Sequence, residues 1–319
     1  MYMAKYIAKR IGLLIFTFAI ILIICFILIK LLPIADVKVF GQDANLIAMR
    51  REKLGYNKPI IVQLGIFAKS VLTEWDWGLG EQIYTGQEVS KVFATKLPAT
   101  ILVNLYAMIF SVPFGLMLGI IAALRKNKMT DHIISTGVMI FVSVPSYVYA
   151  FLVQYLFCFK LGWFPFLMEA STDFFTWTMF WSLCPAIMSL SFGTVAGLAR
   201  YTRAELTEVL TNEFMLLART KGLTKAQATS RHALRNAMVV ILPMIIGEFI
   251  GILAGSIVIE QIFSIPGVGR LYITSITQLD YNFFMMLSAF YTLVGLLASL
   301  VIDLSYGIID PRIRMGSKK

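Results

Sequence analysis

This chain has little charge for its size. Of its 319 residues, 14% are Asp, Glu, Lys or Arg, against roughly 25% in an ordinary soluble domain, and 58% are hydrophobic. The mean hydropathy is +0.78. Long uncharged runs account for the excess, and a bilayer core about 30 Å thick needs only ~20 helical residues to cross it. The composition excludes a water-soluble globule and predicts an all-α protein that crosses the membrane several times.

Catalytic and metal-binding groups are also scarce. Cys25, Cys158 and Cys184 lie in separate apolar runs without metal-ligand spacing, so we expect buried small side chains rather than a metal site or disulfides. His132 and His232 flank apolar runs, with no Ser/His/Asp or metal grouping around either. An intramembrane enzyme would need paired Asp, Ser–Lys or His-rich groups within the spans, and the sequence has none. We predict no enzymatic activity and no metal.

A phosphate-binding loop is missing as well. The sequence contains neither G-x-x-x-x-G-K-[ST] nor any Gly-Lys dipeptide, so there is no backbone cradle for nucleotide phosphates. We expect no cofactor on this chain. Any work driven by ATP has to come from another subunit that binds ATP and Mg.

Six apolar runs predict six membrane helices. They cover residues 11–29, 100–124, 133–159, 174–199, 237–259 and 283–302. The first run is longer than a secretory signal and lacks a cleavage site, so we expect it to be retained. The predicted organisation is an N-terminus at 1–10, a first transmembrane helix at 11–33, an external loop or cap at 34–99 with a short amphipathic helix, a five-helix core at 100–302 and a tail at 303–319.

The distribution of basic residues predicts the orientation. Lys and Arg number three before the first run, three at 125–128, seven at 200–235 and four in the tail, against two in the short loops on the other side. Under the positive-inside rule this asymmetry places both termini and the 200–236 segment in the cytoplasm. We expect a multi-pass protein of the plasma membrane, and the charge pattern suits topology better than nucleic-acid binding.

The basic segment at 200–236 has the local pattern of a helical hairpin. Thr202 with Glu205, and Thr224 with Gln227, each match a capping box. Gly222 lies between them, where a helix end favours a residue that accepts positive φ. The pattern predicts helices at 203–221 and 225–236, the second continuing into the fifth span. Three explanations remain open from the residues alone: a solvated topogenic loop, a DNA-binding helix-turn-helix, which the two adjoining spans disfavour, or a docking element for a cytoplasmic partner.

The stretch "EFMLLARTKGLTKAQATSRHALRNAMVVILP" resembles the EAA loop of binding-protein-dependent ABC importer permeases. The family pattern is an EAA triplet followed by a glycine and then an apolar stretch with a proline. Phe214 and Met215 depart from the second and third letters of the triplet. The resemblance implies an ATPase-coupling loop made of these residues: Glu213, Ala218, Arg219, Lys221, Gly222, Leu223 and Pro243.

Further segments resemble the B-type subunit of the oligopeptide and dipeptide branch of that family, whose relatives also carry nickel. They are "LGYNKPIIVQ", "KLPATILVNL", "IVIEQIFSIPGVGRL" and "DPRIR", which together span residues 54–314. The resemblance implies a bacterial importer of peptides. Its implied partners are a second, C-type permease in a heterodimer, two cytoplasmic ABC ATPases and an extracellular peptide-binding protein.

The fifth run carries the candidate translocation path. Gly247, Gly251 and Gly255 recur every four residues, so one helix face could pack closely against another helix. Glu248 is predicted midway along the span, where a charge costs roughly 2.5–3.5 kcal/mol. Two interpretations of these residues stay open. They could serve packing or pairing within the protein, or they could line the translocation path. Glu248 as a proton site also supports the runner-up function, an ion-coupled secondary transporter. Gly115 and Gly119 form a second small-residue pair that we expect to serve packing.

Overall fold

The computed structural model describes residues 2–32, 42–53, 55–169, 173 and 175–309. Regular structure in these residues is helical, apart from one isolated antiparallel bridge between Leu79 and Glu88. Five helices are long and apolar enough to cross a membrane, and a bent helix pair gives up to six spans. The prediction of an all-α membrane protein is therefore confirmed. The terminal "DPRIR" and part of the predicted external loop, 34–41, lie outside the described residues.

The chain forms two compact units, and the first comprises residues 1–101, 253–261 and 265–300. Its elements are α1 (Tyr2–Lys30), α2 (Gln42–Lys53), α3 (Ile60–Glu74), the start of α4 (Val89–Leu124), α12 (Val268–Thr277) and most of α11 (Ile257–Ile262) and α13 (Tyr281–Ile309). The predicted amphipathic helix of the external cap is α3. Its apolar Phe67 and Val71 pack on a core that includes Trp77, Phe283 and Leu287.

A buried carboxylate fixes the loop that follows α3. Oδ2 of Asp280 accepts hydrogen bonds from the main-chain N–H groups of Glu81, Gln82 and Ile83 at 2.8, 2.8 and 3.0 Å. Asn282 also donates to the carbonyl oxygen of Leu79 at 2.8 Å. Burial raises the pKa of Asp280, while the main-chain donors act to lower it. Residues about 200 positions apart in the sequence are thereby joined.

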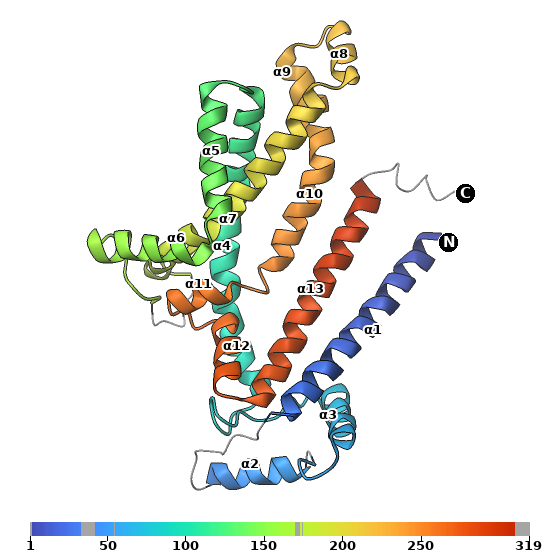
Figure 1. The fold of residues 1–319 in the computed structure, drawn as a ribbon, viewed down its shortest axis with the longest axis vertical. Helices are drawn as coiled ribbons and strands as arrows, with labels where there is room; N and C mark the ends of the chain where they lie inside the picture. The colour runs from blue at the N-terminus through green and yellow to red at the C-terminus, as the bar shows by residue number, and fades with distance from the viewer. Residues whose placement is uncertain (1, 33–41, 54, 170–172, 174, 310–319) are drawn as a thin grey trace. The chain divides into compact units, whose positions relative to one another are not determined.

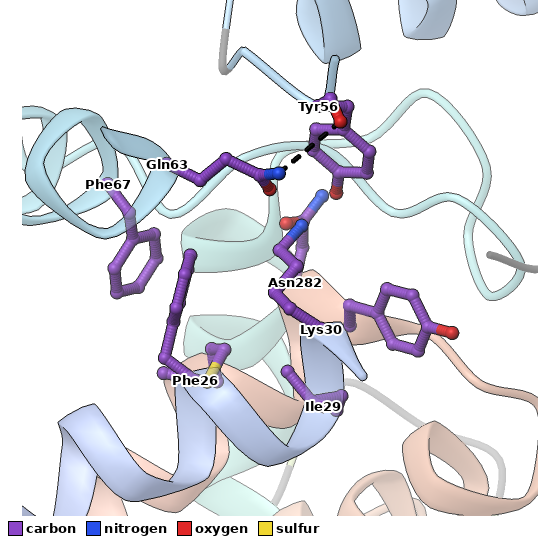
Figure 2. A pocket seen from close by; sticks show the side chains of 9 residues that line it. Phe26, Ile29, Lys30, Tyr56, Gln63, Phe67 and Asn282 are labelled. Carbon is purple, nitrogen blue, oxygen red and sulfur yellow. Dashed lines mark hydrogen bonds between the residues drawn. The ribbon is translucent and has the colours of Figure 1, made fainter. Parts of the chain in front are cut away.

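The end of α1 lies against the segment that leads into α3, as Figure 2 shows. The Lys30 ammonium lies 3.5 Å from the centroid of the Tyr56 ring, a cation–π geometry. The Gln63 amide donates to the carbonyl oxygens of Lys58 at 2.8 Å and Tyr56 at 3.3 Å. Tyr56 in turn donates to Glu81, which also pairs with Arg51. This network holds the segment around Tyr56 at the terminus of the first apolar helix.

The second unit comprises residues 102–252, 262–264 and 301–319. It contains most of α4, then α5 (Met129–Ser143), α6 (Ser146–Val153), a π-helical turn η1 (Gln154–Lys160), α7 (Trp177–Leu210), α8 (Glu213–Thr220), α9 (Lys225–Ala228), a π-helical turn η2 (Thr229–Ala233) and α10 (Leu234–Gly251). Helices α5, α6 and α10 all pack on α7. Between α5 and α6 the chain bends by 103° next to Pro145 (Figure 1), so the predicted third span at 133–159 is broken into two helices.

Helices α4 and α7 approach closely through glycine. A Cβ on Gly115 would lie 2.8 Å from Cβ of Leu198, and a Cβ on Gly119 would lie 2.5 Å from Cβ of Thr202. Both distances are too short for an alanine without movement of the backbone. The glycine pair therefore serves helix packing, as the small-residue spacing predicted.

Several helix boundaries differ from the predicted ones. Helix α4 begins at Val89, eleven residues before the predicted start at 100, and α13 extends beyond both predicted ends of 283–302. The fifth span was predicted to reach 259, but α10 ends at Gly251 and α11 begins only at Ile257. Hydropathy identifies only the apolar part of a helix. Helical turns made of polar residues extend α4 and α13 beyond their apolar runs, and α10 ends at a glycine.

Candidate functional site

The candidate site is the hairpin formed by the end of α7, α8 and α9 in the second unit (Figure 1). The predicted helix start at Thr202 is wrong. Thr202 is 1% exposed and lies inside α7, which continues without a break to Leu210. Its side chain packs against α4 at Gly119, where the absence of a side chain leaves space for it. Thr202 therefore serves helix packing and does not cap a helix. The first break comes at Thr211 and Asn212, directly before α8.

Helix α8 has one face inside the hairpin and one outside. Met215 and Ala218, three residues apart, are 6% and 7% exposed. Leu216 and Leu217 on the other face are 67% and 56% exposed. Large apolar side chains at the tip of a hairpin, next to basic residues, are typical of a surface that another protein covers. The coupling residues predicted from the sequence include neither leucine, although the Met215–Ala218 spacing could have indicated them.

Gly222 closes α8 with a left-handed turn. Its φ is +90°, a value that favours glycine, and its N–H donates to the carbonyl oxygen of Arg219 at 3.0 Å. The N–H of Leu223 reaches back to the carbonyl oxygen of Ala218 at 3.3 Å. These bonds satisfy carbonyl groups at the helix end in the manner of a glycine C-cap. A Cβ at Gly222 would meet no atom within 4 Å, so backbone conformation and not crowding requires the glycine.

The second capping box is present. The N–H of Gln227 donates to Oγ1 of Thr224 at 3.3 Å, and the N–H of Thr224 donates to Oε1 of Gln227 at 3.0 Å. The helix that starts here continues through η2 into α10, as predicted for the second helix of the hairpin. Gly222 and Thr224, which are two positions apart, together define a rigid turn between α8 and α9.

Small side chains fasten the hairpin to the helices below it. Ala228, Ala233 and Ala237 are at most 1% exposed and share one apolar cluster with Leu206 and Met215. Alanine at these positions lets the helix backbones lie close together, so a movement of α8 has to be shared with α7 and α10. The hairpin is therefore built as a solid extension of the membrane helices.

The structure brings six of the seven candidate coupling residues together. Glu213 is in the first turn of α8, Arg219 and Lys221 are exposed at its end, and Leu223 is half-buried beneath the turn. Ala218 is buried and so packs inside the hairpin. A surface hollow at the turn is lined by Leu216, Arg219, Thr220, Gly222, Leu223, Thr224 and Lys225. Pro243 is apart from the others, because it is buried within α10.

The candidate path residues do not share one helix face. Gly247 lies in α10, where an added Cβ would be 3.0 Å from Ile302, and Gly251 ends the helix with no atom within 4 Å of such a Cβ. Gly255 lies beyond α10 at a φ of +67°, so its predicted place on that face is wrong. Glu248 is near the end of α10 rather than midway along it. It is exposed, and its carboxyl group lies near the side chain of Thr194 of α7.

Helices that span a membrane and a rigid hairpin at their end define the membrane component of a larger assembly. The family described as "Binding-protein-dependent transport system inner membrane component" matches residues 115–315, and the chain belongs to this family. This membership disfavours the alternative of an ion-coupled secondary transporter. It also makes the chain a membrane permease subunit and not a catalytic one.

Curated relatives resemble the chain over nearly its full length. A dipeptide transport system permease protein from Lactococcus lactis subsp. cremoris (strain MG1363) is 32% identical over 98% of this chain and 100% of its own. A glutathione transport system permease protein from Salmonella choleraesuis (strain SC-B67) is 31% identical over 98% of this chain and 99% of its own. Among solved structures, one titled "Crystal structure of an amino acid ABC transporter with histidines" covers 68% of this chain and 94% of its own, with 20% identity and a TM-score of 0.51. That likeness concerns the fold.

Proposed function

We propose that the chain forms half of the translocation path of a peptide importer. Two cytoplasmic ATPases would bind ATP and Mg and drive it, a second C-type permease would complete the path, and an extracellular binding protein would deliver the peptide. The names of the relatives, which include dipeptide and glutathione permeases, support peptide as cargo. The basic-residue asymmetry supports cytoplasmic termini in a bacterial plasma membrane.

The observation that carries the proposal is the division of α8 into two faces. Met215 and Ala218 hold the helix inside the hairpin, while Leu216 and Leu217 are exposed at its outer surface. An exposed apolar pair on a well-packed helix suits a protein partner, because burial of the two side chains stabilises the complex without deforming the hairpin. In this proposal the ATPase covers Leu216 and Leu217, and its closing motion is transmitted through α8.

The test is transport and ATPase stimulation by the assembled complex in proteoliposomes. Gly222→Asp places a β-carbon and a charge at a φ of +90°, and we expect it to abolish coupling. Gly222→Asn is the matched control for size, because asparagine tolerates the left-handed conformation better. It should retain more transport than the aspartate variant. Wild-type coupling by Gly222→Asp in a fully assembled complex would contradict the role of this turn.

A second variant tests the contact surface. Leu216→Asp should release the ATPases during purification, whereas Thr211→Asp, which adds the same charge at an exposed position before α8 and outside the hollow, should not. If Leu216→Asp binds and stimulates the ATPases as the wild type does, the partner lies elsewhere.

A further inference from the structure

The first unit contains a cavity of about 330 Å³ between the loop after α3, the start of α4 and the segment 266–274. Lys96 and Arg270 line it, together with Tyr84, Pro266 and Thr274. Among the described residues that line this cavity, the charged side chains are these two cations, and none is acidic. Two cations on one small surface repel each other unless an anion joins them.

The walls of the cavity are held in place by acids that lie outside its lining. Asp280 binds the main-chain N–H groups of Glu81, Gln82 and Ile83, which precede Tyr84. Glu260, 0% exposed, accepts a hydrogen bond from the N–H of Arg270 at 3.1 Å. Both carboxyl groups are thus occupied by main-chain donors, and each fixes a segment that carries a lining residue.

Thr100 and Gly267 complete this frame. The Thr100 hydroxyl bonds to Glu260 at 2.9 Å and accepts from the N–H of Val268 at 2.8 Å. A side chain on Gly267 would collide with the Glu260 carboxylate, so the segment next to Arg270 can lie this close only with glycine. The position of Arg270 is therefore set by buried groups before any ligand arrives, which lowers the entropic cost of binding.

The rim of the cavity has the composition of a protein-binding surface. Tyr84 is 40% exposed, and the Lys96 ammonium lies 5.2 Å from the centroid of its ring. Pro266 beside it is also exposed. Exposed tyrosine and arginine are enriched where proteins bind one another. A small ligand that diffuses freely would need a pocket that encloses it. An acidic side chain on a docking protein needs only cations that pair with its charge and an aromatic rim that contacts its stem.

We propose that Lys96 and Arg270 form a receptor site for a carboxylate side chain of the binding protein that docks on this unit. The site rests on the proposed function, since it presumes such a partner on the external side. The carboxylate lies between the two cations, and Tyr84 covers its aliphatic stem. The site orients the partner and contributes to its recruitment, and it takes no part in nucleotide hydrolysis.

The experiment measures affinity of the purified binding protein for the assembled transporter in nanodiscs, with Lys96→Glu and Arg270→Glu. Each should weaken binding about tenfold or more and remove most of its dependence on salt, since charge complementarity is lost. Lys69→Glu is the matched control: it makes the same charge change at an exposed position of α3 outside the cavity, and it should bind as the wild type does. Wild-type affinity for both pocket variants would overturn the proposal.

Two further measurements separate the possible results. Stimulation of the wild-type ATPase by the binding protein tests the proposed function by itself. If this stimulation is present but the Lys96 and Arg270 variants bind normally, the receptor site is wrong and the proposed function stands. Transport of a dipeptide with a free C-terminal carboxylate is compared with that of its amide. If the variants impair only the free-carboxylate peptide and leave docking unchanged, the cavity binds cargo and the docking proposal is wrong. Restoration of Arg270→Glu by an Asp→Lys or Glu→Lys change on the binding protein would identify the partner residue.

Discussion

Thr100 and Glu260 are 160 residues apart in the sequence, and the hydroxyl of Thr100 donates a hydrogen bond of 2.9 Å to Oε1 of Glu260. The same hydroxyl accepts from the N–H of Val268 at 2.8 Å. Both side chains are 0% exposed. One threonine thus joins the start of α4 to α11 and to the first turn of α12, and its removal leaves two buried polar groups with one partner fewer.

Replacement of this hydroxyl should destabilise the first unit. We expect Thr100→Val, which keeps the shape of the side chain, to cost about 1–3 kcal/mol, the usual cost of leaving a buried polar group unsatisfied. The measurement is the melting temperature of the purified protein in detergent. Thr95→Val is the control, because Thr95 is exposed on the same helix and its hydroxyl donates to the nearby carbonyl oxygen of Val92. Equal melting temperatures for the two variants would contradict the prediction.

Glu260 predicts a dependence of stability on pH. Burial raises the pKa of its carboxyl group, and the hydrogen bonds from Thr100 and from the main chain at 270 and 269 lower it in part. The folded protein therefore holds this proton more tightly than the unfolded chain does. The free energy of unfolding should fall as the pH rises from the ordinary value of 4.5 through the raised pKa.

Glu260→Gln removes that titration. The variant should lose less stability than the wild type as the pH is raised from about 4.5 to about 7, as measured by melting temperature at each pH. Parallel curves for the two proteins would show that Glu260 keeps an ordinary proton affinity.

Gly119 should not tolerate a side chain. A Cβ at this position would lie 2.5 Å from Cβ of Thr202 and 2.7 Å from the carbonyl oxygen of Ala199, so Gly119→Ala forces α4 and α7 apart. We expect a loss of about 1–3 kcal/mol, typical of an overpacked core. Gly137→Ala in α5 is the control, because nothing lies within 4 Å of its Cβ and alanine favours the helix by up to about 1 kcal/mol. In unfolding experiments in detergent, we expect Gly119→Ala to lower the free energy of unfolding and Gly137→Ala to raise it.

Arg203 and Asp131 form a paired contact between α7 and α5. Nε lies 2.5 Å from Oδ1 and Nη2 lies 2.8 Å from Oδ2, and the Asp131 side chain is 1% exposed. Arg203→Met leaves this carboxylate buried without its cation. The expected cost is about 2–4 kcal/mol, below that of a fully buried pair because the Arg203 side chain is 33% exposed.

The control for this pair is Lys91→Met. Lys91 pairs with Glu88 across one helical turn, with side chains 76% and 46% exposed, so its loss should cost no more than about 1 kcal/mol. If both methionine variants unfold at the wild-type denaturant concentration, the Arg203–Asp131 pair contributes little to the link between α5 and α7.

Local patterns predicted part of the hairpin and not the rest. Thr224 and Gln227 cap a helix because both partners lie within one turn, and Gly222 needs only its own backbone conformation. These facts are visible in a short stretch of sequence. Thr202 has the same spacing to Glu205, but it faces the gap at Gly119 on another helix, and a short stretch cannot show that contact.

The candidate path shows a second kind of failure. Glycines at every fourth position predict one face only while the helix continues, and α10 ends at Gly251. Gly255 then takes a positive φ, as glycine readily does at a turn. The anchoring roles of Asp280 and Glu260 were also beyond prediction, because the main-chain donors at 81–83 and the hydroxyl of Thr100 lie about 200 and 160 residues away in the sequence.

Helix α7 has 34 residues, which gives a length of about 51 Å at 1.5 Å per residue. A hydrocarbon core about 30 Å thick leaves about 20 Å of this rod to stand clear of the lipid. In the proposed function, a sideways push of a few ångströms at the end of α7 that carries the hairpin would tilt the whole helix about the membrane surface. Its far end would then move the opposite way, with no hinge along the helix.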